Sequence, residues 1–134
     1  MNDIFVGTWK LNVEQSAFDP KHVPTAGTMV FELDSEGVYL MKAEGVTAAG
    51  DKVAERPQRF LLDSKEHPVP DIPGLTAVTS RPDSNTLVAE GRMNGKVVGR
   101  ASYIVSADGR TLTATASGMG TQGPFETRAV FNRQ

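Results

Sequence analysis

Apolar and polar residues alternate along most of this chain with a period of two, which is the pattern of strands that bury one face. Residues 28–34 read TMVFELD and residues 111–116 read TLTATA, so each segment has one apolar and one polar face. No segment shows a sustained 3.6-residue period, and at most one turn of helix is expected, at residues 14–18. The pattern therefore predicts an all-β protein.

Turn-forming residues separate these runs at short intervals, for example at Asn94-Gly95. The runs between turns predict about nine strands, with boundaries good to ~2–4 residues. They are residues 4–13, 28–34, 37–45, 52–62, 75–81, 86–93, 96–106, 111–118 and 125–133. Short turns join consecutive strands into antiparallel hairpins, and an open meander would leave long unpaired edges. We therefore expect residues 1–134 to form one domain, a single closed antiparallel up-and-down β-barrel of about eight to ten strands.

Two longer segments interrupt this rhythm, at residues 14–27 and at residues 63–74, and the second carries three prolines. Proline-bearing loops of this length form semi-rigid covers on the protein surface. In a barrel we expect both segments to lie over one open end.

The composition argues against several classes of function. Of 134 residues, 39% are apolar and 22% charged, as in a single globular domain. The formal net charge is −2, which argues against nucleic-acid binding, because that needs a basic surplus. The chain has no cysteine, which excludes thiol catalysis and metal sites with cysteine ligands.

The chain carries no pattern of membrane insertion or secretion. No apolar run approaches the roughly 20 residues that span a bilayer, and the first residues lack the pattern of a secretory leader. We therefore expect no membrane span and a cytoplasmic location, with a homodimer left open.

Residues 118–123 match the G-x-G-x-x-G pattern of dinucleotide-binding proteins. Such a site needs this loop to begin a helix, with an acidic residue about 20 positions later. Here a β-type run follows and the chain ends at Gln134. The segment is therefore predicted to be a glycine-rich hairpin turn.

Residues 7–11, GTWKL, resemble the G-x-W start of lipocalins and the start of intracellular fatty-acid-binding proteins. Residues 127–131, TRAVF, resemble the T-R-x-Y ending of the second family. Over nearly its whole length the chain is similar to a group of small bacterial lipocalin-like proteins. That similarity lies in residues 7–12, Ser16 and Phe18, residues 68–69 and residues 106–113. It implies a lipocalin-like, calycin-type barrel.

The resemblance also implies roles for Trp9 and Arg128. In lipocalins the motif tryptophan plugs one barrel end beneath an arginine of the last strand, so pairing of the two end strands would place Arg128 near Trp9. In fatty-acid-binding proteins the arginine and tyrosine of the last motif hold a ligand carboxylate, and here Val130 stands at the tyrosine position. The alternation of Phe125 and Thr127 with Arg128 instead predicts an outward arginine, and both interpretations stay open.

Several positions expected to face the barrel interior carry small side chains, namely Ala89, Gly91, Ala114, Ala116, Gly118 and Ala129. A barrel of this size holds one small ligand when its lining is small. We therefore predict a non-catalytic site for a small, mostly hydrophobic molecule, with no cofactor, metal or catalytic residue. The predicted ligand-binding residues are Phe31, Tyr39, Leu40, Arg59, Phe60, Met93, Tyr103, Phe125 and Arg128.

Three other functions are kept open. An enzyme of the isomerase or cyclase type would need an ionisable side chain facing the interior, for which His67, Glu55 and Tyr103 are candidates. A metal would be bound by His22 and His67 together at one barrel mouth, and a haem would take His67 as its axial ligand. No metal-binding spacing connects the two histidines. A barrel filled by its own side chains would act through its outer surface.

Overall fold

The computed structural model of the chain describes residues 4–17, 25–47, 49–54, 58–69, 72–120 and 123–134. All regular secondary structure in these ranges is β-strand. No helix within them has the length and apolarity that a membrane span requires. The all-β class that the alternation predicts is confirmed.

Eleven strands form in the described residues, eight long ones and three of three residues each. Their bounds are β1 Gly7–Ala17, β2 Ala26–Leu33, β3 Tyr39–Val46, β4 Lys52–Ala54, β5 Gln58–Phe60, β6 Glu66–Pro68, β7 Leu75–Asp83, β8 Thr86–Met93, β9 Lys96–Val105, β10 Thr111–Gly120 and β11 Gly123–Arg133. The three short strands account for the excess over the predicted number.

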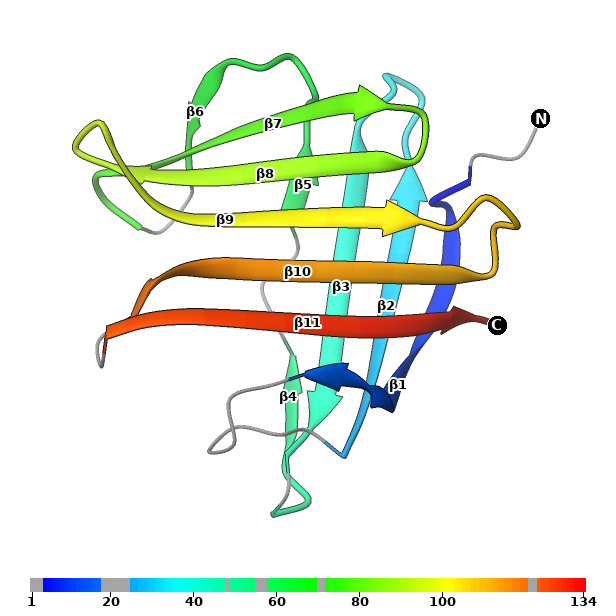
Figure 1. The fold of residues 1–134 in the computed structure, drawn as a ribbon. Helices are drawn as coiled ribbons and strands as arrows, with labels where there is room; N and C mark the ends of the chain where they lie inside the picture. The colour runs from blue at the N-terminus through cyan, green and yellow to red at the C-terminus, as the bar shows by residue number, and fades with distance from the viewer. Residues whose placement is uncertain (1–3, 18–24, 48, 55–57, 70–71, 121–122) are drawn as a thin grey trace.

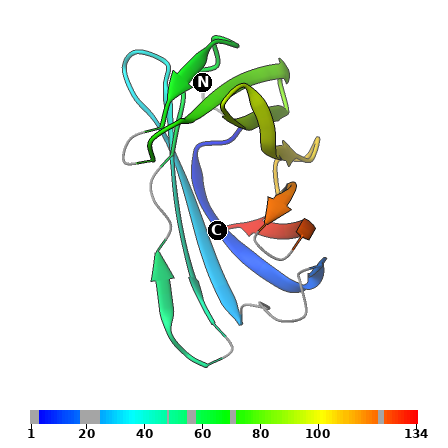
Figure 2. The same cartoon turned by 90° about the vertical axis from the view of Figure 1, so that its left-hand side faces the viewer.

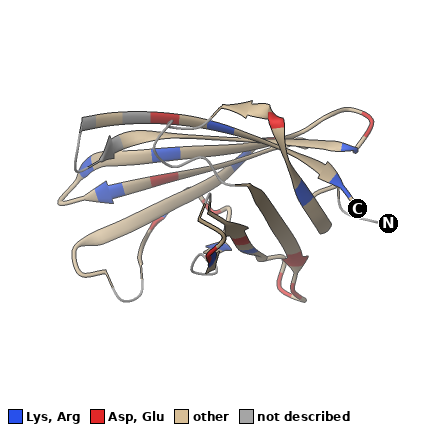
Figure 3. Ribbon diagram, turned by 90° about the horizontal axis from the view of Figure 1, so that it is seen from below, with Lys and Arg blue, Asp and Glu red and all other residues tan. Residues whose placement is uncertain are grey.

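The sheet is an antiparallel up-and-down meander. Its order is β4-β3-β2-β1-β11-β10-β9-β8-β7-β6, and β5 pairs with β3 beside β4. The pairing of β1 with β11 brings the first and last strands together. Figure 1 shows β2 and β3 crossing behind β9 to β11, and Figure 2 shows the two layers edge-on. Lysine, arginine, aspartate and glutamate are distributed over both layers (Figure 3).

Three local predictions differ from the structure. Residues 52–62 contain two short strands instead of one long one, and the predicted loop at residues 63–74 contains β6. The helical turn expected at residues 14–18 is wrong for its described part, because β1 continues to residue 17. The Ser16 hydroxyl keeps β1 attached to β11 across an irregularity, since it donates to the Asn12 carbonyl (2.7 Å) and accepts from the Val130 amide (2.8 Å).

The glycine-rich segment at residues 118–123 is a hairpin, as predicted. β10 ends at Gly120 and β11 begins at Gly123, and these two residues pair. The Asn94-Gly95 turn also matches its prediction, because both residues have positive φ, 53° and 82°.

The buried core lies between the two layers, toward the end of the barrel that holds the β2–β3, β7–β8 and β9–β10 turns. It contains Phe5, Trp9, Met29, Phe31, Tyr39, Met41, Phe60, Leu87, Tyr103, Val105, Leu112 and Phe131. We call this the plugged end.

The sheet order ends at β4 on one side and at β6 on the other, so strand pairing does not close the sheet as the sequence predicted. A short segment lies between the two edges. We call residues 61–65, which follow β5, the seam segment. The Leu62 amide donates to the Thr79 hydroxyl of β7 (2.9 Å), and the Ser64 amide donates to the Thr79 carbonyl (3.0 Å). The hydroxyl and the carbonyl of Thr79 therefore link the seam segment to β7.

Candidate functional site

The plugged end is built around Trp9, which is completely buried. Its indole Nε1 donates to the Phe5 carbonyl (3.0 Å). The guanidinium of Arg133 lies 4.2 Å from the centroid of the Trp9 ring. It also donates to the carbonyls of Gly109 (2.7 Å), Val6 (2.9 Å) and Ile4. One arginine thus ties the last strand to the N-terminal segment and to the β9–β10 turn.

An arginine covers Trp9, but that arginine is Arg133. The prediction that Arg128 lies near Trp9 is wrong. The register pairs Trp9 with Arg133 and Ala17 with Arg128, so Arg128 lies toward the other end of β1. Arg128 is exposed, and its guanidinium reaches the Gln15 carbonyl at 3.5 Å. The sequence offered two arginines on this strand, and only the pairing register distinguishes them.

A layer of aromatic rings belongs to the same buried core as Trp9. Phe31 and Phe60 are each 1% exposed, and both contact the ring of Tyr103, with centroids 6.0 and 5.5 Å apart. Phe5 joins the layer through Phe31 and Tyr39. Four of the predicted ligand-binding residues therefore form a packed aromatic layer in this core, namely Phe31, Tyr39, Phe60 and Tyr103.

The guanidinium of Arg81 lies at the edge of this aromatic layer. It donates to the Tyr39 hydroxyl (2.7 Å) and to the Ser84 carbonyl (2.7 Å). Its guanidinium also lies over the rings of Phe5 (5.4 Å) and Tyr39 (5.7 Å). The contacts hold the β7–β8 turn against the N-terminal segment, and no pattern in the sequence points to this residue.

Beyond the aromatic layer, the inner face of β7 to β11 carries small, uncharged residues in cross-strand rows. The register defines these rows as Tyr103, Ala114 and Ala129, then Ala89, Ala101, Ala116 and Thr127, then Ala77, Gly91, Gly99 and Gly118. All the small residues in them are half-buried, whereas the aromatic layer is fully buried. The predicted small positions thus lie on the inner face. Fewer of them pack against the core in the rows farther from the plugged end.

Two of these glycines are not required by the backbone. A Cβ at Gly99 would meet only the Ser117 carbonyl, at 3.6 Å, and one at Gly91 would meet nothing closer than 3.8 Å. By contrast, a Cβ at Gly27 would come within 3.3 Å of Leu11. A Cβ at Gly91 or Gly99 would therefore fit without disturbing the sheet.

The remaining predicted ligand-binding residues are spread over the molecule. Leu40 and Arg59 pair with each other on the face opposite Tyr39 and Met41, and Arg59 lies 4.0 Å from Asp34. Met93 lies half-buried at the far end of β8. Phe125 pairs with Gly118, and its side chain lies outside the described residues, as do Glu55 and His22.

His67 lies on the same side of the sheet as the small-residue rows, because it pairs with Ala77. Its Nε2 lies 2.7 Å from Asp63 Oδ2 in the seam segment. The Lys65 amide and the His67 ring both hydrogen-bond to Asp63, and they lower the pKa of its carboxyl group below the usual value. The His67 ring is therefore paired with Asp63.

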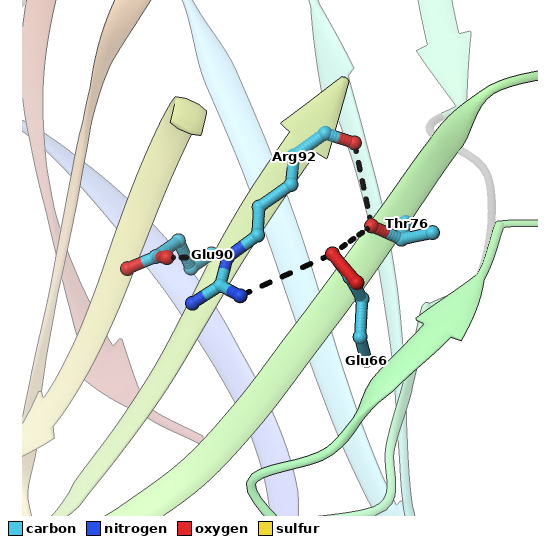
Figure 4. Close-up of polar contacts among 4 residues, drawn as sticks. All are labelled: Glu66, Thr76, Glu90 and Arg92. Carbon is cyan, nitrogen blue, oxygen red and sulfur yellow. Dashed lines mark hydrogen bonds and ion pairs between the residues drawn. The ribbon is translucent and has the colours of Figure 1, made fainter. Parts of the chain in front are cut away.

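Glu66 turns to the outer face, where it joins β6 to β7 and β8 (Figure 4). The Thr76 hydroxyl donates to its carboxylate (2.7 Å), and Arg92 lies 4.0 Å from the same oxygen and 2.9 Å from Glu90. Exposed ion pairs of this kind contribute little to stability. The network holds the short strand β6, and with it His67, beside β7.

Other places for a ligand are weaker. No group of three or more histidine, aspartate or glutamate side chains in the described ranges is arranged to hold a metal ion. An open groove of about 380 Å³ lies where β1 departs from β11, lined by Lys10, Leu11, Asn12, Val13, Glu14, Asn132 and Gln134. The Asn12 amide is already bonded to Gln15 and Asn132. We therefore take the barrel interior as the candidate site.

Comparison with solved structures identifies the fold. The fluorescent protein UnaG superposes with a TM-score of 0.68 at 17% identity, over 100% of both chains. A zebrafish ileal bile-acid-binding protein in complex with cholic acid gives 0.59 at 12% identity, over 98% of this chain and 99% of the other. As-p18, an extracellular fatty-acid-binding protein, gives 0.51 at 16% identity, over 98% and 97%. A scan of protein-family models and a search of curated proteins found no match.

Proposed function

We propose that this protein binds a small, mostly hydrophobic molecule inside its barrel and carries or senses it without changing it. The observation that carries the proposal is the gradient along the inner face, from a sealed aromatic layer to rows of small, uncharged, half-buried residues. An apolar ligand held there gains about 25 cal/mol for each Å² of apolar surface that it buries.

The proposed site combines the floor of the barrel with the rows above it. Phe31, Phe60 and Tyr103 form its apolar base, and Tyr39 lies beside them. Met93 and Phe125 lie farther from the plug by their strand positions. Leu40, Arg59 and Arg128 lie away from the inner face and are left out of the proposed site.

The ligands of the structural neighbours support this class of molecule. The zebrafish protein was solved with cholic acid, and As-p18 is a fatty-acid-binding protein. A third neighbour, mFAP2b, was solved with the small molecule DFHBI, at a TM-score of 0.57 and 10% identity. The likeness extends to the fold, and the class of ligand in this chain is our proposal.

The experiment uses a matched pair of variants at adjacent positions of β9. Gly99→Phe fills the interior, whereas Arg100→Phe adds the same ring on the outer face, where Arg100 is exposed. The probe is 1-anilinonaphthalene-8-sulfonate, whose fluorescence rises in an apolar site. We expect Gly99→Phe to weaken its binding at least tenfold (about 1.4 kcal/mol) and Arg100→Phe to change it less than twofold.

Both variants are checked for an intact fold by circular dichroism, so that a lost site is not confused with a lost structure. Equal probe binding by folded Gly99→Phe and wild type would place the ligand elsewhere and overturn the proposal. Native mass spectrometry and a thermal-shift screen with fatty acids, retinoids, haem, cholic acid and small aromatic molecules would then name the ligand, because a ligand that binds the folded state raises the melting temperature with its concentration.

An isomerase or cyclase is the second candidate, favoured by the Asp63–His67 pair on the side of the inner face. An aspartate that holds one imidazole nitrogen orients the other for proton transfer. The same mass-spectrometric experiment separates the two functions, since a carrier returns its ligand unaltered and an enzyme returns a rearranged product.

The cellular location, source and oligomeric state of the protein stay predictions. We keep a cytoplasmic location, a bacterial source and the open question of a homodimer as they follow from the sequence. As-p18 is extracellular, so this fold is not tied to one compartment. Size-exclusion chromatography with light scattering measures the oligomeric state.

A further inference from the structure

The wall of the barrel is weakest at the seam segment. β10 and β11 pair over ten register positions, and β8 and β9 over eight. Between β5 and β7, in contrast, the described residues contribute two hydrogen bonds, and both end on Thr79. Local opening of a protein occurs where few backbone hydrogen bonds must break, so this is the part of the wall that opens most easily.

The backbone of the seam segment is also strained. Leu62 and Ser64 have φ of 58° and 60°, a region that residues with a Cβ rarely adopt. Such strain persists only where surrounding contacts enforce it. Straightening the segment would relieve this strain, which offsets part of the cost of breaking its hydrogen bonds.

Contacts at both ends of the segment hold it in the strained form. Asp63 accepts from the Lys65 amide (3.0 Å) and bonds the His67 ring (2.7 Å), which fixes the segment to β6. The Leu62 side chain packs against the aromatic core. The segment is therefore held by β6 on one side and by the core on the other.

We propose that the seam segment is a side gate, through which the apolar ligand enters and leaves the interior between β5 and β7. This inference rests on the proposed function. Opening withdraws Leu62 from the core and releases Thr79, and the inner row next to Thr79 begins with Ala89. The opened wall thus leads directly onto the small-residue face.

The first test measures opening without any ligand. Hydrogen exchange followed by nuclear magnetic resonance should show the Leu62 and Ser64 amides exchanging at least about 100-fold faster than the Leu112 and Ala114 amides. Equal protection of the two groups would mean that the seam opens only with the whole barrel, and would overturn the proposal.

The second test measures the rates of probe binding by stopped-flow fluorescence with 1-anilinonaphthalene-8-sulfonate. Thr79→Val removes the acceptor of the Leu62 amide and keeps the side-chain shape, and Asp63→Ala removes the contact to His67. Loss of one such hydrogen bond favours opening by roughly fivefold. We expect both the association and the dissociation rate constants to rise about fivefold, with the Kd unchanged within twofold.

The matched control is Thr115→Val, which removes a hydroxyl bonded to Ser102 elsewhere in the wall and should change neither rate constant. If Gly99→Phe abolishes probe binding but Thr79→Val and Asp63→Ala leave both rate constants unchanged, the interior site stands and the gate is refuted. If Gly99→Phe leaves probe binding intact, the proposed function itself fails, whatever the seam variants do.

Discussion

Replacing Arg133 tests the assignment of the plug most directly. The residue stacks on Trp9 at 4.2 Å and donates to three backbone carbonyls, which belong to the N-terminal segment and to the β9–β10 turn. Arg133→Met keeps most of the aliphatic stem and removes every one of these polar contacts. Arg133→Lys keeps the charge but has no planar fork to reach three acceptors at once.

The expected loss follows from these contacts. A stacked cation over an indole contributes about 1 kcal/mol, and each hydrogen bond contributes about 1 kcal/mol net. The sum predicts that Arg133→Met lowers the free energy of unfolding by about 4 kcal/mol. Arg133→Lys should lose about half of that. Since domains of this size are stable by about 5–15 kcal/mol, the larger effect is well within measurement.

Urea unfolding followed by tryptophan fluorescence is a suitable assay, because Trp9 is the single tryptophan and lies under the substituted residue. The control is Arg128→Met, which removes one long contact from an exposed arginine and should cost less than about 0.5 kcal/mol. Equal losses at the two positions, or no loss at Arg133, would refute the assignment of Arg133 to the plug.

Two further predictions concern turns. Gly95 has φ of 82°, and a Cβ added there would have nothing within 4 Å, so Gly95→Ala should destabilise the protein by about 1 kcal/mol through backbone strain alone, as measured by urea unfolding. Hydrogen bonds from the Ser106 side chain and the Arg110 amide lower the pKa of Asp108 below its usual value. A lowered pKa in the folded state adds stability above the unfolded pKa of about 3.9, and this is lost as pH falls through the folded value. Wild type should therefore lose more stability than Asp108→Asn between pH 5 and pH 2, as followed by thermal unfolding, and parallel losses would contradict this.

The strands could be predicted because their signals are local. Alternation along β2 and β10, and turn residues such as Asn94-Gly95, depend only on neighbours in the chain. The predicted strands at residues 86–93 and 96–106 match β8 and β9 to within one residue at each end. The same local pattern placed the small residues of β8, β10 and β11 on one face.

The candidate site was predicted only in part, because local signals do not determine how distant strands pair. Phe31, Phe60 and Tyr103 follow the alternation and do lie together on the inner side. Leu40 and Arg59 were predicted from their chemistry, and the pairing of β3 with β5 places them on the other face. A residue type suited to a ligand does not by itself determine on which face of a strand it lies.

The all-β meander, its turns and the inward set of small residues follow from the order of residues alone, since a period of two needs no knowledge of distant contacts. Which arginine covers Trp9 depends instead on the folded chain, because the register of β1 against β11 joins residues 111 to 124 positions apart. The pairing of His67 with Asp63 and the link of the seam segment to Thr79 depend on the folded chain as well. Both arise in the seam segment, where regular strand pairing stops, and no periodic pattern in the sequence records such contacts.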